Sequence, residues 1–268
     1  MSAPPSELNL DPFYTKVIFA DGIPIVASSA VPDAGLTIAA AMIRSMLQNR
    51  PDIAAAMVRN GQRIAIMAQS EGTTDLPEQR DWKKPTPDDP RLTFCERKHY
   101  QQRIGSLTDQ QYWNKRARGM GGILTSVGVE NLFGTGNDRY FGESILVHEF
   151  SHGILSTLEQ TDPAFYAEVE KAYAAAKKKG LWKGEYAETT VQEYWAEGTQ
   201  YWFNNNKLGV INGRRILSDT DLTSYDPTLA VLLRKIYGDR HRIDRDGYWM
   251  HPARVPGGKA PVSTAEVC

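Results

Sequence analysis

Two of the five histidines of this chain stand four residues apart in the stretch GESILVHEFSHGIL, residues 142–155. A helix advances by about 100° per residue, so His148 and His152 would lie about 40° apart on one face, where their imidazoles can converge on one ion. Glu149 would stand beside that stripe. Two neutral imidazoles bind Zn²⁺, and a neighbouring carboxylate can take a proton from the water that the metal activates. The spacing predicts His148 and His152 as zinc ligands and Glu149 as a general base.

The residues around these three side chains are mostly apolar, which favours the metal-binding interpretation. The alternative is that the two histidines only line a buried polar pocket. Burial of two unpaired imidazoles and a carboxylate would cost several kcal/mol unless something binds them. The apolar neighbours that predict a buried helix are Ile145, Leu146, Val147, Phe150, Ile154 and Leu155.

A third ligand is expected downstream, because a catalytic zinc has three protein ligands and one open position. The stretch TTVQEYWAEGTQYWF (189–203) places Glu193 and Glu197 four apart on one helix face. We assign Glu193 as the ligand and Glu197 as the carboxylate that accepts the outer N–H of a ligating histidine, although the two roles could be swapped. A solvated acidic stripe is the alternative, but the neighbours are aromatic: Tyr194, Trp195, Trp202 and Phe203. Other carboxylates that could bind the metal, each without a carboxylate partner four residues away on an apolar helix, are Glu159, Asp162 and Glu188.

Together, HEFSHGIL and YAETTVQEYWAEGTQYWF resemble the zincin core of anthrax lethal factor and the secreted Pro-Pro endopeptidases, whose two helices read H-E-F-G-H and E-[FY]-F-A-E. The resemblance covers roughly residues 143–205. In that family a tyrosine seven residues before the ligand glutamate points at the metal-bound oxygen, and Tyr186 stands seven before Glu193. The resemblance therefore implies three zinc ligands, a general base and an oxyanion donor, namely His148, His152, Glu193, Glu149 and Tyr186.

The role of the tyrosine also has a chemical basis of its own. A phenol near the metal can donate a hydrogen bond to the charge that develops on an attacked carbonyl oxygen. The alternative for Tyr186 is an ordinary exposed tyrosine, since it lies in the polar stretch GEYAE and is one of 12 tyrosines.

The elements that must position these residues are predicted from hydrophobic periodicity and from turn residues. The N-terminal part contains two short strands within 15–27, helices at 33–49 and 51–60, a buried strand at 63–68 and a glycine-bounded strand within 121–133. A stretch rich in Pro, Asp and Thr, 69–92, predicts a long surface loop, and loops of that length often line a site. Three helices follow, at 143–159, 163–179 and 190–204.

The fold class is therefore predicted as α+β, and the resemblance implies a zincin-like metalloprotease fold. We expect one domain over residues 1–268. It would consist of an N-terminal α/β half, a helical zinc-binding half and an irregular tail, at 12–142, 143–237 and 238–268.

Zincins usually carry, just before the active helix, an edge strand that pairs with an extended substrate. The stretch TSVGVEN (125–131) stands at that place, so Glu130 and Asn131 at its end are candidates for ligand contact. A strand end with an Asn turn is the alternative. Of the remaining histidines, His99 is expected at the surface, and His241 and His251 lie in the irregular tail, where Trp249 and His251 could reach the cleft.

Composition narrows the classes of molecule that this protein could bind. The net charge is −1, with Lys and Arg scattered along the chain, so no basic footprint for nucleic acid or an anionic membrane is present. No apolar run approaches the roughly 20 residues of a membrane span. The expected partner is a peptide or another small substrate in a cleft, and no pattern indicates an oligomeric state.

The sequence leaves two alternatives for the cellular compartment. The start, MSAPPSELNLDP, has no apolar signal core, so the protein is either cytoplasmic or secreted after loss of an export signal. The two cysteines, Cys95 and Cys268, could form a disulfide in an oxidising compartment, or could be two unrelated thiols.

The predicted function is a zinc-dependent hydrolase, a metalloendopeptidase in which a zinc-activated water attacks a carbonyl and Glu149 is the base. The alternatives are a zincin-fold hydrolase with a non-peptide substrate and a zinc-binding module without catalysis. Glu149 argues against the last of these, because a structural zinc site needs no general base.

Overall fold

The structure is a computed structural model that describes residues 1–90, 92, 94–211 and 213–255. Within these residues the first half of the chain builds a five-stranded sheet with the spatial order β1-β2-β3-β5-β4. The strands are β1 (Lys16–Ala20), β2 (Ile23–Ala27), β3 (Arg63–Met67), β4 (Gly119–Met120) and β5 (Leu124–Gly128). The three central strands β2, β3 and β5 run parallel, whereas β1 and β4 pair antiparallel with their neighbours.

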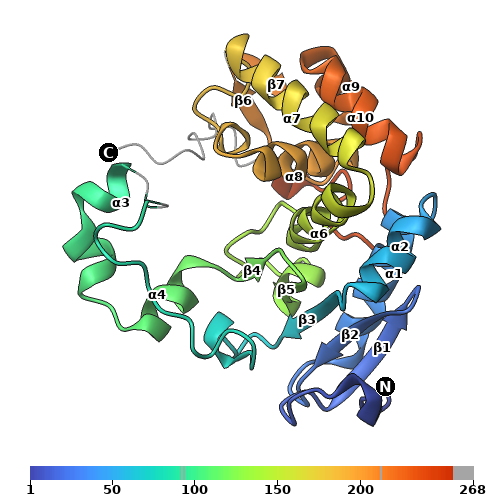
Figure 1. Cartoon of the computed structure of the whole chain (residues 1–268), viewed down its shortest axis with the longest axis vertical. Helices are drawn as coiled ribbons and strands as arrows, with labels where there is room; N and C mark the ends of the chain where they lie inside the picture. The colour runs from blue at the N-terminus through green and yellow to red at the C-terminus, as the bar shows by residue number, and fades with distance from the viewer. Residues whose placement is uncertain (91, 93, 212, 256–268) are drawn as a thin grey trace.

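Two helices, α1 (Asp33–Leu47) and α2 (Pro51–Arg59), pack beside this sheet (Figure 1). α1 contacts β1 and β2, and α2 contacts β2 and the later helix α6. Their apolar faces are buried, with Leu36, Ile43 and Met57 fully enclosed. Both helices lie close to the predicted ranges because Pro32 and Pro51 fix where each begins.

The second half is mostly helical. It contains α6 (Ile145–Thr161), α7 (Pro163–Lys178), α8 (Val191–Trp202), α9 (Asp219–Tyr225) and α10 (Pro227–Tyr237), with the hairpin of β6 (Gly209–Ile211) and β7 (Arg214–Ile216). α6 lies between the sheet and the other helices, and α8 packs directly on it (Figure 1). The predicted α+β class, with the α/β layer first and the helical half afterwards, is confirmed.

Polar side chains set the start of the helices that matter for the site. The Asn131 carboxamide oxygen accepts the backbone N–H of Ile145 at 2.9 Å and so caps α6. The Asp162 side chain accepts the N–H of Phe165 at 3.1 Å, ahead of which Pro163 opens α7. Thr190 caps α8 in the same way. These caps fix where along each helix the functional residues fall.

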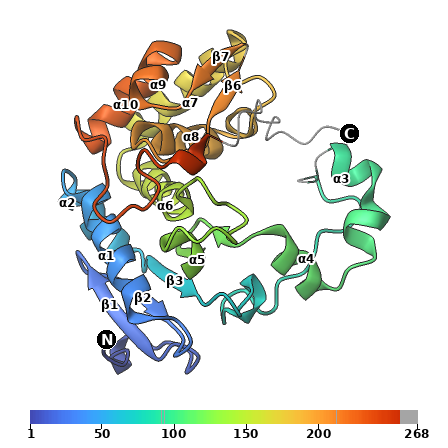
Figure 2. The ribbon, with the colours of Figure 1, turned by 180° about the vertical axis from the view of Figure 1, so that it is seen from behind.

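A segment that we call the arm, residues 72–118, leaves the sheet after β3 and returns to it at β4 (Figures 1 and 2). It carries α3 (Phe94–Lys98), a π-helical turn and α4 (Asp109–Arg116). Its apolar core is small and is formed by Leu92, Ile104 and Tyr112. Lys84 holds the arm together, because its Nζ donates to the carbonyls of Ile104, Gly105 and Leu107.

Two sequence expectations differ from the structure. The strand expected within 121–133 ends at Gly128, and the short helix α5 (Val129–Leu132) follows it. The prediction that residues 125–131 form the edge strand is wrong, because β5 is interior and the two-residue strand β4 lies at the edge of the described sheet. The edge is so short that no alternation of apolar residues marks it in the sequence.

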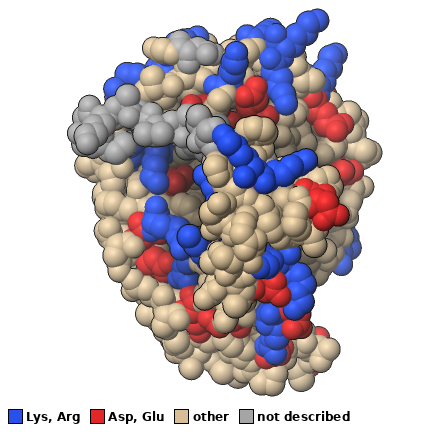
Figure 3. Space-filling view, turned by 90° about the vertical axis from the view of Figure 1, so that its left-hand side faces the viewer, with Lys and Arg blue, Asp and Glu red and all other residues tan. Residues whose placement is uncertain are grey.

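Of the helices in the described residues, none has the length and apolarity that a membrane crossing requires. Over the lower two thirds of the face in Figure 3, basic and acidic side chains lie interspersed. Cys95 is buried, and Cys268 lies outside the described residues. The tail region 238–255 is irregular apart from a short 3₁₀ turn at Pro252–Arg254.

Candidate metal centre

Helix α6 presents both histidines of the H-E-x-x-H stretch on one face. His148 is buried, and Glu149 and His152 are largely enclosed. The two imidazole rings stand edge to face with their centroids 4.9 Å apart. The four-residue spacing therefore does bring the imidazoles together, as helix geometry requires.

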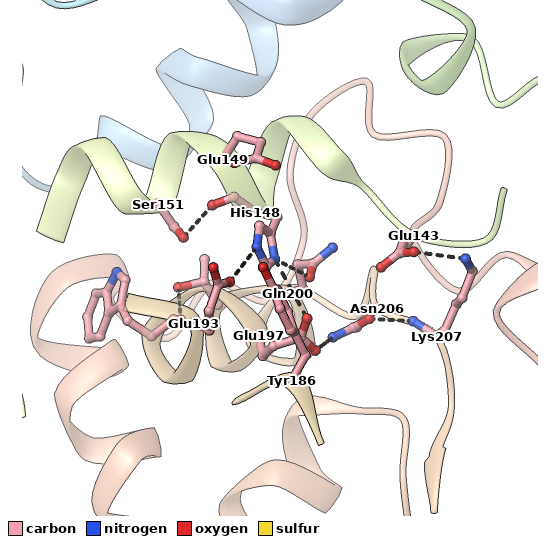
Figure 4. Close-up of polar contacts among 12 residues, drawn as sticks. Glu143, His148, Glu149, Ser151, Tyr186, Glu193, Glu197, Gln200, Asn206 and Lys207 are labelled. Atoms are coloured by element: carbon pink, nitrogen blue, oxygen red, sulfur yellow. Dashed lines mark hydrogen bonds and ion pairs between the residues drawn. The ribbon is translucent and has the colours of Figure 1, made fainter. Parts of the chain in front are cut away.

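Helix α8 brings Glu193 to the same point (Figure 4). Its Oε2 lies 3.0 Å from His148 Nε2 and 3.5 Å from His152 Nε2. One ligand atom from each of the three residues lies within 4.8 Å of the others. The three side chains predicted as ligands thus converge through two imidazole nitrogens and one carboxylate oxygen, a donor set that suits zinc.

The outer nitrogens of both imidazoles face amide oxygens of α8. His148 Nδ1 lies 2.9 Å from Gln200 Oε1, and His152 Nδ1 lies 3.4 Å from Gln192 Oε1. The Gln200 amide is oriented by its own Nε2, which donates to the Ser144 carbonyl at 3.0 Å. An amide oxygen can only accept, so Nδ1 of His148 carries a proton, and Nε2 becomes the metal-binding nitrogen once it gives up its own proton.

Gln200 was missed by the sequence analysis, which gave this role to Glu197. Glu197 Oε1 is 3.8 Å from His148 Nδ1, which is beyond hydrogen-bond distance, whereas Gln200 Oε1 is 2.9 Å from the same nitrogen. The signal was present, since Gln200 stands seven residues after Glu193 and therefore on the same helix face.

Without a metal, the three residues share protons. Burial alone would lower the pKa of His148, but the hydrogen bond to Glu193 and the nearby carboxylates raise it to about 10. Burial alone would raise the pKa of Glu193, but its bonds to His148 and His152 hold that pKa below its usual range. Metal binding at these atoms therefore has to displace a proton.

Glu149 lies beside the two imidazoles without being bonded to them. Its Oε2 is 4.0 Å from His152 Nε2. Burial raises the pKa of this carboxyl above its usual range, against the opposing effect of the two histidines. A carboxylate whose pKa is raised in this way is a better proton acceptor than an ordinary exposed glutamate.

A polar chain continues from Glu197 to the other side of the site (Figure 4). Burial raises the pKa of Glu197 to about 7. Its Oε2 accepts from Asn206 Nδ2 at 2.8 Å, and Lys207, the next residue, bonds Glu143 at 2.8 Å. Glu197 thus supports the wall of the site through Asn206, and it acts on His148 through its charge and not through a hydrogen bond.

Tyr186 stands in a 3₁₀ turn just before α8, with its ring roughly parallel to that of His148 and the centroids 6.3 Å apart. Burial of the phenol, the charge of Glu193 and a hydrogen bond to Glu193 all raise the pKa of Tyr186. The phenol therefore stays protonated and can act as a donor. Tyr186 as a whole residue is 41% exposed, and it lines the cavity that holds the predicted ligands.

These residues line one cavity of about 640 Å³. Side chains of α6 and α8 form one wall, and residues of the arm and of β4 form the other. From α6, α8 and their flanks the lining residues include Glu143, His148, Glu149, His152, Tyr186, Gln192, Glu193 and Glu197. From the opposite wall they include Trp113, Arg116, Ala117, Gly119, Met120, Gly121 and Gly122. The long loop 69–92 was expected to line the site, but the residues that do so come later in the arm.

The glycines of the stretch GMGG allow β4 to approach α6. A Cβ at Gly119 would lie 2.3 Å from Ile145 Cγ2 and 3.0 Å from Glu149 Oε1, and one at Gly121 would lie 2.7 Å from His152 Cβ. Only glycine fits at these two positions without displacing the helix. In the sequence the stretch GMGG is too weak a motif to predict a function. In the structure it places the edge strand beside Glu149.

The other candidates have local roles. Glu130 forms a buried ion pair of 2.6 Å with Arg118, and Asn131 caps α6, so both have structural partners at the positions where ligand contact was a candidate. Asp162 caps α7, and Glu188 accepts the backbone N–H of Gly184. The remaining residues considered are not among the described residues that line the cavity of the predicted ligands: Glu159, His99, His241, Trp249 and His251.

Comparisons with known proteins show a similarity to a solved structure. No family model matches the sequence, and a search of curated proteins finds no match. A solved structure similar to this chain is that of the Pro-Pro endopeptidase PPEP-2 from Paenibacillus alvei, with 19% identity and a TM-score of 0.44 over 79% of this chain and 96% of that one. An identity of 19% does not place the chain in that family, so the resemblance drawn from the two motifs stays a prediction.

Proposed function

We propose that this protein is a zinc-dependent hydrolase that cleaves peptide bonds. The observation that carries the proposal is the convergence of His148, His152 and Glu193 in one cavity, with the carboxyl of Glu149 beside them. Nε2 of each histidine and Oε2 of Glu193 would hold the metal. When bound, zinc would supply a Lewis acid that makes water acidic and polarises a carbonyl.

The chain's own residues account for the proton movements. Glu149 would take the proton of the attacking water on its carboxylate and later give it to the leaving amine. Its enclosed position and raised pKa suit both roles. Tyr186 would donate its phenol hydrogen bond to the oxyanion that develops on the attacked carbonyl.

A peptide is favoured over other substrates by the edge strand. β4 borders the cavity at the edge of the described sheet, and its glycines let the strand lie close to α6, beside Glu149. An extended peptide can add to an exposed sheet edge through backbone hydrogen bonds, which a compact small molecule cannot do. An extended peptide paired with β4 would therefore pass close to Glu149.

Two measurements test the proposal. Elemental analysis of protein never exposed to chelator should find about one zinc per chain, because three ligands converge on packed helices. Glu149→Gln should keep that zinc and lose turnover of a peptide library by about 10²–10⁴-fold, because the amide keeps the shape but cannot accept a proton. Glu159→Gln, on the exposed face of the same helix, is the matched control and should cleave like the wild type.

Absence of bound transition metal, or undiminished cleavage by Glu149→Gln, would contradict the assignment. Zinc content without cleavage of any peptide, in both wild type and variant, would instead support the non-peptide or non-catalytic alternatives.

A further inference from the structure

A second cavity, of about 320 Å³, lies in the arm next to the candidate metal centre. It is lined by Glu96, Gln102, Arg103, Ile104, Leu107, Tyr112, Lys115 and Arg116. Among the described lining residues, Arg116 is common to this cavity and to the one that holds the predicted zinc ligands. The two hollows therefore meet at the last residue of α4.

The two cavities differ in charge. The described lining of the metal-site cavity includes four carboxylates, Glu143, Glu149, Glu193 and Glu197, and its one Lys or Arg is Arg116. The arm cavity is lined by three cationic side chains, Arg103, Lys115 and Arg116, against the single carboxylate Glu96. A molecule that runs from the first cavity into the second therefore passes from an acidic environment to a basic one.

Arg116 is held at this junction by a short ion pair. Its Nη1 donates to Glu96 Oε1 at 2.8 Å, and the Glu96 side chain is only 8% exposed whereas that of Arg116 is 49% exposed. A guanidinium carries five N–H donors, so a second carboxylate can still bind. The guanidinium of Arg116 is thus anchored by Glu96, lines both cavities and can donate further hydrogen bonds to a ligand.

Arg116 and Tyr186 also line the same metal-site cavity, together with Glu149. A peptide whose scissile bond lies between Glu149 and Tyr186 would therefore have Arg116 close by.

We infer that Arg116, with Arg103 and Lys115 behind it, forms a subsite for a carboxylate of the substrate, an inference that rests on the proposed peptidase function. A guanidinium matches the geometry of a carboxylate and binds it by charge-assisted hydrogen bonds. The carboxylate can belong to an Asp or Glu side chain near the scissile bond or to the C-terminus of a short peptide. Both sources present the same group to the arm.

Cleavage of three peptide pools by the zinc-loaded full chain tests the subsite. The first pool has capped termini and contains Asp and Glu, the second replaces them with Asn and Gln, and the third has the second pool's composition with a free C-terminus. We expect kcat/KM for the first or the third pool to exceed that for the second by about tenfold, as one charge-assisted hydrogen bond allows. Which pool is preferred identifies the source of the carboxylate.

Variants tie that preference to the arm. Arg116→Gln should remove the preference, so that kcat/KM for the carboxylate pools falls to the value for the second pool. Lys115→Gln, which does not disturb the bond to Glu96, should reduce the preference in part. Arg59→Gln is the matched control, since Arg59 is also an exposed arginine in the last turn of a helix but lines neither cavity. Cleavage without a carboxylate preference, or a preference that survives both arm variants, overturns the subsite.

A binding measurement separates this inference from the proposed function. The Glu149→Gln chain, immobilised and loaded with zinc, is exposed to the three pools, and the retained peptides are quantified by mass spectrometry. Retention of carboxylate peptides that Arg116→Gln abolishes supports the subsite even if nothing is cleaved. Equal retention of all pools overturns it whether or not the chain is a peptidase.

Discussion

Two regions face each other across the candidate site, and they are held in place differently. Helices α6 and α8 are fixed by apolar packing, with Phe150, Ile154, Trp195 and Trp202 completely buried. The arm has only a small apolar cluster and depends on polar anchors such as Lys84 and Arg118. Groups that must keep a geometry within about 0.5 Å lie on the packed helices, and groups that would select a substrate lie on the arm. In many enzymes a rigid scaffold positions the reacting groups, and more variable segments at the surface contact the substrate.

The largest effect should come from the packed region. Glu193→Ala leaves two imidazoles at the site and should lose zinc outright. Glu197→Ala should weaken zinc binding by less than about tenfold, because Glu197 Oε1 lies 3.8 Å from His148 Nδ1, beyond hydrogen-bond distance. Titration of zinc against a competing chelator compares the two variants.

That pair of variants also tests the register of α8. Both residues project from one face of the helix, one turn apart, so the comparison reports which carboxylate reaches the metal. If Glu197→Ala loses zinc and Glu193→Ala retains it, the assignment of the ligand is wrong by one turn. The role given to Tyr186 would then fail as well, since it depends on Glu193.

The next largest effect should come from the anchor of the arm. Arg118 bonds Glu130 through two nitrogens and also donates to the carbonyls of Ala68 and Glu71. Arg118→Ala leaves Glu130 buried without its partner and should lower the free energy of unfolding by about 3–5 kcal/mol. Urea denaturation of the metal-free protein measures the loss.

The control is an arginine that is exposed. Arg139 also donates to a backbone carbonyl of the arm, at 2.8 Å from Lys115 O, so Arg139→Ala should cost less than about 1 kcal/mol. The folded Arg118→Ala protein should still bind zinc like the wild type, because the ligands lie on α6 and α8. A loss of zinc affinity comparable to that of Glu193→Ala would show that the two regions are not separable.

The packed region was largely predictable from the sequence. Helical spacing places His148 and His152 on one face, and the apolar neighbours predict burial, so α6 follows from local pattern. Glu193 was found because the three-ligand requirement of zinc directed attention to a carboxylate on an apolar helix. The ends of these helices were predicted within a few residues, since Asp162, Pro163 and Thr190 are strong local signals.

The arm was not predictable to the same degree, because non-local contacts order it. α3 and α4 have charged sequences without apolar periodicity, and Lys84 holds the segment through carbonyls some 20 residues away. One local signal was available: Thr108 and Gln111 form a capping box that marks the start of α4. The partner of His148 was missed for a related reason, since the choice between Glu197 and Gln200 depends on how α8 crosses α6.

The smallest effect separates the two glutamines within the packed region. Gln200 is fully buried and bonds His148 at 2.9 Å, whereas Gln192 is only half-buried and lies 3.4 Å from His152. Gln200→Leu should weaken zinc binding by about 10–100-fold, because the buried outer N–H of His148 loses the amide oxygen that accepts it. Gln192→Leu should cost less than about tenfold, since water can take the place of the amide at a half-buried position. Equal losses of zinc affinity in the same chelator titration would mean that the burial of the glutamine has no effect on its contribution. Orientation of the His148 ring by Gln200 would then not be what favours metal binding.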